Sequence, residues 1–316
     1  MYKDMEAEKK PILTNHYYEI AGLQLELRFP STLNLDNVLS SFVGFRKDRG
    51  DGTSVAVVTF KEEEVPSEEE WGALRSDISL VWGDNFRFYE QEGAFVTLIK
   101  HNVKDKQWMM KSTKDFRESV LYGKSEDPRM GEFVSWLLMV VFGQVGLQHQ
   151  LILIHASVIA YKNKQGVAFL GKSGTGKSTH SRLWLQHIPN TELLNDDNPV
   201  VRLEEDGKVM IYGTPWSGKT PCYKDKRVEL KGFVRLEQAP LNRFTRKKGM
   251  EGLIAVLPSC TALRWNKDLF NAMTDTLSQL VDRVNVGHLE CLPDADAAKM
   301  SHKALFYEKN SDEVVA

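Results

Sequence analysis

The segment GKSGTGKS, residues 171–178, constrains the fold of this 316-residue chain more than any other feature. The apolar run VAFL directly before it predicts a buried strand. The run KSTHSRLWLQHI predicts a helix that begins at Lys177 and ends before Pro189. A strand and a helix joined by a short glycine-rich turn are typical of α/β domains. The sequence therefore predicts an α/β core in the second half of the chain.

The same segment fits the pattern G-x-x-x-x-G-K-[ST], and each fixed residue type has a chemical reason. Glycines let successive N–H groups point at phosphate oxygens, and the helix N-terminus adds partial positive charge. Lys177 would bridge the outer phosphates of a nucleotide, and Ser178 would offer its hydroxyl to Mg²⁺. The alternative is a glycine-rich turn with a coincidental Lys-Ser pair. The predicted nucleotide-binding residues are Gly171, Ser173, Gly174, Thr175, Gly176, Lys177, Ser178 and Thr179.

An acidic pair, Asp196 and Asp197, follows the short apolar run of TELLNDDNPVV. Asp196 lies 18 residues beyond Ser178, which is enough for one helix and a return to a neighbouring strand. Both carboxylates would then lie at the sheet edge where α/β proteins bind ligands, one holding Mg²⁺ and the other accepting a proton. Adjacent residues on a regular strand point to opposite faces, so both reach one site only if the chain bends there. An ordinary Asx-rich turn is the alternative.

A histidine, His155, stands within the apolar segment ILIHASVIAY, inside or at the end of a predicted strand. A lone histidine in such a run is more often a core residue than a catalytic one. The functional alternative places it beside the phosphate site, where it would orient a catalytic carboxylate.

His-Ala-Ser, GKSGTGKS and NDD together resemble the catalytic domain of the HPr kinase/phosphorylase family, which is itself similar to ATP-dependent phosphoenolpyruvate carboxykinase around this loop. The resemblance covers roughly residues 150–213. It implies an ATP- and Mg²⁺-dependent P-loop kinase with a mixed sheet that phosphorylates a serine hydroxyl of a protein or peptide. By the same resemblance Asp196 would mainly serve Mg²⁺, Asp197 would act as the base, and His155 would be an active-site residue.

The chain departs from that family at two points. The family usually carries Glu directly after the Lys-Ser of the loop, whereas this chain has Thr179 and His180. Instead of the family's later substrate-handling segment, the chain has GTPWSGKTPCY and LEQAPLNRFTRKKG. In the first of these, Lys219 is a candidate lid cation, with a surface turn as the alternative. In the second, Arg243 is a candidate phosphate contact, with a solvated basic loop as the alternative.

The first half of the chain has a different pattern. YYEIAGLQLELRF alternates around a glycine turn, with Leu23, Leu25, Leu27 and Phe29 on one face, and further alternating runs continue to about residue 122. Residues 67–70 form a capping-box pattern that predicts a helix start before WGALRSDI. We predict a smaller β-rich α+β domain over residues 1–125, suited to acceptor recognition. The polar stretch GKSEDPRMG separates it from the nucleotide-binding domain at 131–316.

Composition excludes several classes of protein. The chain has 41 Lys+Arg against 43 Asp+Glu, so it lacks the basic excess of a nucleic-acid binder. Its three cysteines show no CxxC spacing, which favours free thiols in a reducing compartment and a cytoplasmic protein. The apolar run over residues 133–147 is shorter than the roughly 18 residues that span a membrane, so it predicts a buried helix and no membrane partner. A homo-oligomer is compatible with the sequence.

The main hypothesis is therefore an ATP- and Mg²⁺-dependent kinase that acts on a hydroxyl. The loop and Lys177 would hold the phosphates, Ser178 and Asp196 the metal, and Asp197 with His155 would activate the acceptor. Two alternatives stay open. One is a nucleotide-gated binding or regulatory protein with little catalysis, and the other is a small-molecule kinase of the carboxykinase type.

Overall fold

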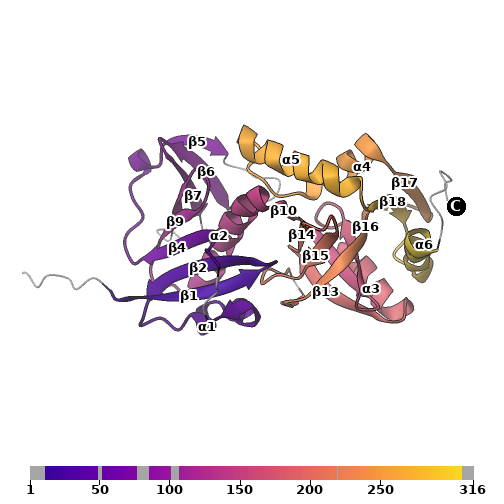
Figure 1. Ribbon diagram of the computed structural model, residues 1–316, viewed down its shortest axis with the longest axis horizontal. Coiled ribbons are helices and arrows are strands. Elements are labelled where there is room, and N and C mark those ends of the chain that lie inside the picture. Colours follow the sequence, from indigo (N-terminus) through magenta and orange to yellow (C-terminus); the bar gives the residue numbers. More distant parts are fainter. Residues whose placement is uncertain (1–10, 49–51, 77–84, 101–106, 219, 308–316) are drawn as a thin grey trace, which may run out of the picture.

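A computed structural model of the protein describes residues 11–48, 52–76, 85–100, 107–218 and 220–307. These residues form a mixed α/β structure with two large β-sheets, each containing parallel and antiparallel pairs (Figure 1). Helix α2 (Met130–Val145) lies between the sheets and contacts strands of both. The mixed α/β class predicted from the sequence is thus confirmed.

The first sheet is built from the N-terminal part of the chain, in the order β3-β1-β2-β4-β9-β8-β7-β6-β5. Its pairs are antiparallel except β2–β4 and β4–β9. The predicted alternation is confirmed, because Leu23, Leu25, Leu27 and Phe29 are all buried. The strands are β1 (Leu13–Ile20), β2 (Leu23–Pro30), β3 (Arg46–Lys47), β4 (Ala56–Lys61), β5 (Ala73–Ser76), β6 (Phe86–Gln91), β7 (Ala94–Lys100), β8 (Gln107–Thr113) and β9 (Glu118–Tyr122).

The capping box forms at Ser67 and Glu70, but the helix predicted after it is wrong. The chain makes one 3₁₀ turn, η2 (Glu68–Glu70), and then enters β5, which pairs with β6. Gly72 between them has a φ of 86°, and a Cβ there would lie 2.3 Å from the Glu90 carbonyl oxygen. The backbone therefore leaves the helical region at Gly72 because the chain docks closely on β6.

Helix α2 is the buried helix that the apolar run predicted. Phe133, Leu137 and Phe142 are essentially inaccessible to solvent. The stretch Met130–His149, which includes the short turn η3 (Gly146–His149), is long and apolar enough to cross a membrane by length and composition alone. In this structure 72% of it is buried between the sheets, and a core helix passes the same test of length and composition.

The second sheet runs in the order β10-β14-β15-β16-β12-β11-β13, and β16 also pairs with β18, which pairs with β17. The alternation of VVRLEEDGKVMIYG around Asp206-Gly207 predicts a hairpin, and β14 and β15 form it, with a φ of 82° at the glycine. The β12–β16 and β16–β18 pairs are parallel. The strands are β10 (Leu151–Leu153), β11 (Ala156–Tyr161), β12 (Gln165–Leu170), β13 (Thr191–Asp197), β14 (Val200–Leu203), β15 (Val209–Tyr212), β16 (Arg227–Gln238), β17 (Arg243–Lys247) and β18 (Asn285–Cys291).

Helices cover the second sheet and connect its strands. The stretches LFNAMTDTLSQLVDRV and ADAAKMSHKALF are amphipathic and predict helices, and both form. Each helix has a side-chain cap: Asn266 accepts from the amides of Asp268 and Leu269, and Asp294 accepts from that of Ala297. The helical elements not yet given are α1 (Leu35–Val38), η1 (Ser40–Phe45), α3 (Lys177–His187), α4 (Gly249–Val256), η4 (Leu257–Ser259), α5 (Lys267–Val281) and α6 (Ala295–Phe306).

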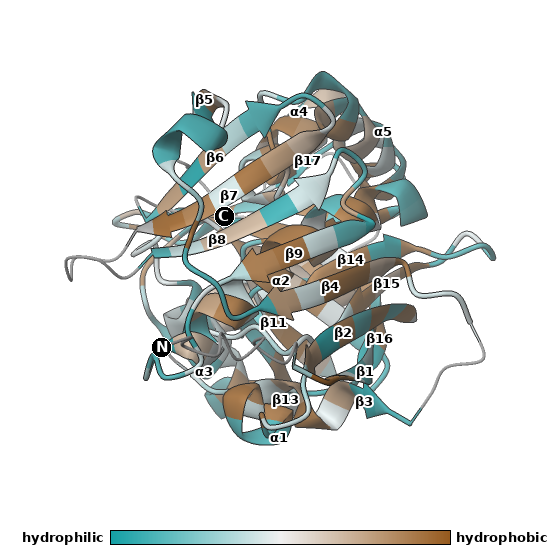
Figure 2. Cartoon of the chain, turned by 90° about the vertical axis from the view of Figure 1, so that its left-hand side faces the viewer, coloured by the Kyte–Doolittle hydropathy of each residue, from teal (hydrophilic) through white to brown (hydrophobic). Residues whose placement is uncertain are grey.

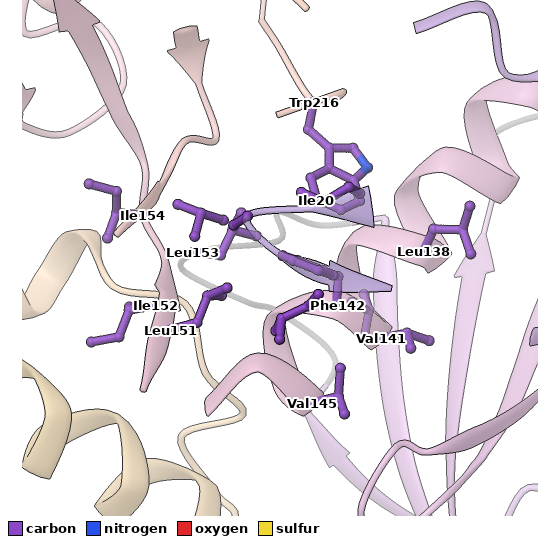
Figure 3. Close-up of a cluster of buried hydrophobic side chains, with 14 of the residues drawn as sticks. Ile20, Leu138, Val141, Phe142, Val145, Leu151, Ile152, Leu153, Ile154 and Trp216 are labelled. Carbon is purple, nitrogen blue, oxygen red and sulfur yellow. The ribbon is translucent and has the colours of Figure 1, made fainter. Parts of the chain in front are cut away.

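A single cluster of buried apolar side chains joins the two sheets through α2. Figure 3 shows Ile20 from β1, Val141 and Phe142 from α2, Leu153 from β10 and Trp216 packed together. The strands of the first sheet lie before the polar stretch at 123–131 and those of the second sheet lie after it. The two predicted domains thus share a core, and their boundaries stay a prediction.

The other face of the first sheet is turned away from α2 (Figure 2). In the described part of the chain no α-helix lies over this face. Trp71, beside the η2 turn, packs there with Tyr89, Val96 and Met109 in a small separate apolar cluster. The N-terminal block is therefore a sheet with apolar clusters on both faces, and its larger core lies on the side of the second sheet.

Candidate functional site

The glycine-rich segment lies between the end of β12 at Leu170 and the start of α3 at Lys177, as its flanking patterns predicted. Gly171, Gly174 and Gly176 have φ values of 153°, 84° and 97°, which are unfavourable for other residues. A Cβ on Gly171 would lie 2.3 Å from Thr175 Oγ1, whereas one on Gly174 would meet nothing within 4 Å. The loop is thus tightly packed at Gly171 and open at Gly174.

Two further predicted loop residues, Ser173 and Thr175, have different environments. Ser173 is exposed. Thr175 Oγ1 donates to the Lys172 carbonyl oxygen at 2.8 Å and so braces the loop from inside. The Thr179 hydroxyl accepts from Arg182 at 3.4 Å in the first turn of α3.

The N-terminus of α3 supplies free backbone donors to this loop. Its N-cap is Gly176, and no side chain caps it. The first intrahelical bond is from the His180 amide to the Gly176 carbonyl, at 2.8 Å, so the amides of Lys177, Ser178 and Thr179 have no partner within the helix. Such donors, together with the helix dipole, favour an anion at this position.

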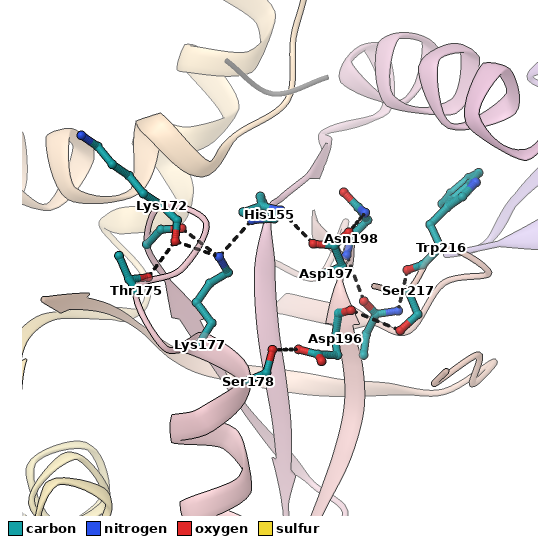
Figure 4. Close-up of polar contacts among 12 residues, drawn as sticks. His155, Lys172, Thr175, Lys177, Ser178, Asp196, Asp197, Asn198, Trp216 and Ser217 are labelled. Atoms are coloured by element: carbon teal, nitrogen blue, oxygen red, sulfur yellow. Dashed lines mark hydrogen bonds and ion pairs between the residues drawn. The ribbon is translucent and has the colours of Figure 1, made fainter. Parts of the chain in front are cut away.

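Lys177 is held in place by three acceptors. Its Nζ lies 3.0 Å from the Gly171 carbonyl oxygen, 3.3 Å from that of Lys172 and 2.9 Å from His155 Nε2 (Figure 4). Burial lowers the pKa of Lys177, and the nearby carboxylates of Asp197 and Asp196 oppose that shift. The Lys177 amine is therefore held in place by the loop carbonyls and His155 before any ligand binds.

His155 connects Lys177 to the acidic pair. It lies between β10 and β11, and its backbone amide donates to the Ser259 carbonyl at 2.8 Å. Its Nδ1 lies 3.0 Å from Asp197 Oδ1, and its side chain is 35% exposed. An ammonium can only donate, so Nε2 accepts from Lys177 and Nδ1–H donates to Asp197. This arrangement selects the neutral tautomer with the proton on Nδ1.

The two aspartates end β13 and reach the same site. Strand β11 is antiparallel to both β12 and β13, so the latter two run in the same direction and end at the same sheet edge. Asp196 Oδ1 accepts from Ser178 Oγ at 3.0 Å, and Asp197 faces His155 (Figure 4). The required bend is present, because Asp197 has a φ of 146°, a value rare for any residue except glycine.

The loop over residues 213–218 contacts the acidic pair through Ser217 and Gly218. The Gly218 amide donates to the Asp196 carbonyl at 2.6 Å, and Ser217 forms an isolated β-bridge with Asp197. A Cβ on Gly218 would lie 3.1 Å from Asp197 Cβ, so a larger residue here would have to push the aspartate aside. Lys219, the predicted lid cation, lies outside the described residues.

Trp216 ties that loop to the first half of the chain. Its ring packs edge-on against Phe42 of η1 with centroids 5.6 Å apart, and its Nε1 donates to the Ser135 carbonyl of α2 at 2.9 Å. The indole is 4% exposed. The loop that contacts the carboxylates is therefore continuous with the core beneath the first sheet.

The basic segment around Arg243 is not the loop that its composition suggested. Residues Arg243–Lys247 form strand β17, which pairs with β18. The Arg243 guanidinium is engaged by Glu290 in an ion pair at 2.5 Å. Strand pairing with a distant segment explains the difference, and a phosphate contact by Arg243 stays a prediction.

His180, one of the departures from the resembled family, is a core residue. It is 3% exposed, packs edge-on against Phe169 and lies 3.1 Å from Ser301 Oγ through Nε2. That hydroxyl already donates to α6 carbonyls and accepts from Trp184 Nε1, so His180 donates to it through Nε2. The residue packs α3 against α6 and takes no part in the site.

His180 should make stability depend on pH. Burial lowers its pKa to about 4 from an ordinary value of 6.5. The unfolded chain takes up the proton first, so stability present above pH 6.5 is lost as the pH falls towards 4, by about 3 kcal/mol in all. Urea titrations at pH 7 and pH 4 should show this loss in the wild type and a smaller one in His180→Gln. Equal losses in both proteins would contradict the assignment.

Several site residues were missed from the sequence. Asn198 donates through Nδ2 to Asp197 Oδ2 at 2.8 Å, and Gln238 at the end of β16 donates to the Gly174 carbonyl at 3.2 Å. Asn198 directly follows the acidic pair, so its position was a signal for its role. Gln238 carried no such signal, because only the parallel β12–β16 pairing brings it to the loop.

Ser178 and Asp196 are the residues suited to a magnesium ion. Mg²⁺ usually keeps several waters and binds one or two carboxylates together with substrate phosphates. The Ser178 hydroxyl and Asp196 carboxylate, in contact beside the uncapped helix N-terminus, fit that donor set. In the chain as far as it is described, no group of three or more His, Cys, Asp or Glu forms a metal cage. A magnesium ion here would be bound by Ser178 and Asp196 together with oxygen atoms of a phosphate group.

Comparison with known proteins finds a structural likeness but no match in sequence. No family model matches the chain, and no curated protein matches it significantly. Among solved structures it is similar to the Hpr(Ser) kinase/phosphatase from Coxiella burnetii, with 12% sequence identity, over 48% of this chain and 86% of that chain. The TM-score of this likeness is 0.28.

Proposed function

We propose that this protein transfers the γ-phosphoryl group of ATP to a hydroxyl group, with Mg²⁺ as cofactor. One observation carries the proposal: Lys177, His155 and Asp197 form a continuous hydrogen-bonded line beside the glycine loop, next to the Ser178–Asp196 contact. A phosphate-binding element and a positioned carboxylate base thus lie within one site. Simple nucleotide binding needs the first of these and has no use for the second.

In the proposed reaction the chain mainly positions groups and neutralises charge. The amides of α3 and the Lys177 amine bind the β- and γ-phosphates. Mg²⁺ held by Ser178 and Asp196 would offset the negative charge of those phosphates. The Asp197 carboxylate accepts the proton of the acceptor hydroxyl as its oxygen bonds to the γ-phosphorus. The bond from that phosphorus to the bridging oxygen breaks, and ADP leaves.

His155 and Asn198 keep Asp197 in the position of a base. Each donates one hydrogen bond, to different carboxylate oxygens, so the carboxylate is oriented when the acceptor arrives. His155 in turn accepts from Lys177 and so couples the base to the phosphate-binding amine. Phosphate bound at Lys177 would therefore influence the orientation of Asp197 through His155.

The proposed acceptor is a serine hydroxyl of a protein or peptide, as the motif resemblance implies. The first half of the chain is the proposed acceptor-recognition part, because Trp216 connects the loop over the carboxylates to η1 and α2. We also propose a cytoplasmic location. The free thiols of Cys222 and Cys260, both buried, are compatible with a reducing compartment.

The test uses the purified full chain, Mg²⁺ and ATP labelled at the γ-phosphate. Calorimetry should show binding of Mg-ATP, and label should appear in proteins or peptides of a lysate. If neither ATP nor GTP binds, the proposal fails. Binding without transfer to proteins, peptides or metabolites would instead indicate a nucleotide-gated binding protein. Transfer to metabolites alone would indicate a small-molecule kinase.

A further inference from the structure

The buried amide of Asn195 lies one residue before the acidic pair and is fully excluded from solvent. Its Nδ2 donates to the Trp216 carbonyl at 3.1 Å and to Thr214 Oγ1 at 3.3 Å. Its Oδ1 accepts from the Asn198 amide at 3.1 Å. The Asn195 side chain therefore links the residue that follows the acidic pair to the loop at residues 214–216.

Thr214, which is also fully buried, closes this network. Its Oγ1 donates to the Asn198 carbonyl at 2.7 Å and accepts from the Trp216 amide at 3.2 Å. The residue that follows Asp197 is thus held at its amide by Asn195 and at its carbonyl by Thr214. Buried side chains therefore hold both the N–H and the C=O of Asn198.

The backbone at this point needs such support. The register between β11 and β13 shifts so that Val158 opposes Asn195 while Ile159 opposes Leu193, which leaves Leu194 as an extra residue. Two residues after Asn195, Asp197 takes its φ of 146°. A conformation this unfavourable persists only when surrounding contacts impose it. Without the bend, Asp197 would point to the opposite face of the strand from Asp196.

We propose that Asn195, together with Thr214, is a positioning residue that holds the backbone bend at Asp197, so that both carboxylates face the glycine loop. It touches neither the nucleotide nor the acceptor and acts through the main chain of residues 196–198. The network also fixes Trp216, so the loop over residues 213–218 is held in register with the carboxylates. The inference rests on the proposed phosphoryl transfer for its effect on rate.

The test compares four single variants and one double variant of the full chain. Asn195→Ala and Thr214→Val each remove part of the network, and Thr214→Val does so without a change of shape. Thr214→Ser keeps the hydroxyl and is the conservative rescue. Cys222→Ala is the matched control, because Cys222 is also buried against β13, with Sγ 3.3 Å from the Leu194 carbonyl oxygen, but lies outside the network.

The first readout is turnover of Mg-ATP, counted as all γ-phosphate released to water or to lysate acceptors. Asn195→Ala and Thr214→Val should lower kcat by about 10- to 100-fold and leave the KM for Mg-ATP within about threefold, because misplacing a catalytic group affects rate more than binding. Thr214→Ser and Cys222→Ala should retain kcat. A double variant of Asn195 and Thr214 should lose little more than Asn195→Ala, since both act through one bend.

The second readout, amide hydrogen exchange, does not depend on activity. The amides of Asn198 and Gly218 should exchange faster in Asn195→Ala and Thr214→Val than in the wild type or Cys222→Ala. Wild-type kcat in both network variants, or unchanged exchange at these amides, would overturn the inference and leave the proposed function standing. Absence of any Mg-ATP turnover in the wild type would instead overturn the proposed function.

Discussion

Replacing Asp197 by asparagine should lower phosphoryl transfer by about 1,000-fold, which is within the usual contribution of a general base. The amide keeps the size of the carboxylate and can still accept from His155 Nδ1, 3.0 Å away, so the site should keep its shape. What the amide loses is the capacity to take the proton of the acceptor hydroxyl. Affinity for Mg-ATP should stay within about threefold. The measurements are label transfer under saturating nucleotide and calorimetric binding.

The matched control for this change is Asp225→Asn. Asp225 loses the same charge, but its side chain is 43% exposed and lies 3.7 Å from Lys47, away from the glycine loop. It should transfer phosphate at the wild-type rate. If Asp197→Asn also transfers at that rate, Asp197 is not the base. If it loses nucleotide binding instead, Asp197 belongs with the metal-binding groups.

Replacing Lys177 by alanine should weaken Mg-ATP binding by about 100-fold, equivalent to about 3 kcal/mol. The amine is held by the carbonyls of Gly171 and Lys172 and by His155, so its charge is in place before the nucleotide arrives. A charge-assisted contact of this kind loses little entropy on binding and is stronger than a contact from a mobile lysine. Calorimetry with Mg-ATP measures the loss, and thermal unfolding of the free variant shows whether the fold is kept.

Lys172→Ala is the control in the same loop. Lys172 is exposed, and Figure 4 shows its side chain directed away from Lys177 and His155. This variant removes one positive charge and should bind Mg-ATP within about threefold of the wild type. An equal loss of affinity in both variants would mean that the net charge of the loop, and not the positioned amine, holds the phosphates.

Local patterns predicted those elements whose stability depends on near neighbours in the chain. The β1–β2 hairpin, the β14–β15 hairpin and helix α3 all follow from alternation, glycine turns and helix periodicity. The capping box at residues 67–70 also formed, because it needs only four adjacent residues. The helix after it did not form, since pairing of β5 with the distant β6 outweighed local propensity.

In the candidate site, too, the sequence predicted only what depends on neighbouring positions. Its residue types could be named in advance, because a phosphate loop and a carboxylate pair each occupy consecutive positions. The contact partners could not, because they come from separate elements: His155 meets Lys177 across 22 positions, and Trp216 meets Ser135 across 81. Asn195, two residues before the bend, carried no signal for its partners in the loop at 213–218.

The sequence by itself determined the glycine loop, its helix and the apolar strand before it, because backbone freedom at glycine and apolar periodicity act over a few residues. The tertiary structure alone decided that His155 joins Lys177 to Asp197, that His180 is a core residue, and that Asp197 turns towards the loop. Each of these depends on which strands pair and on where buried polar groups find their partners. Those outcomes are properties of the packed chain and not of any one segment.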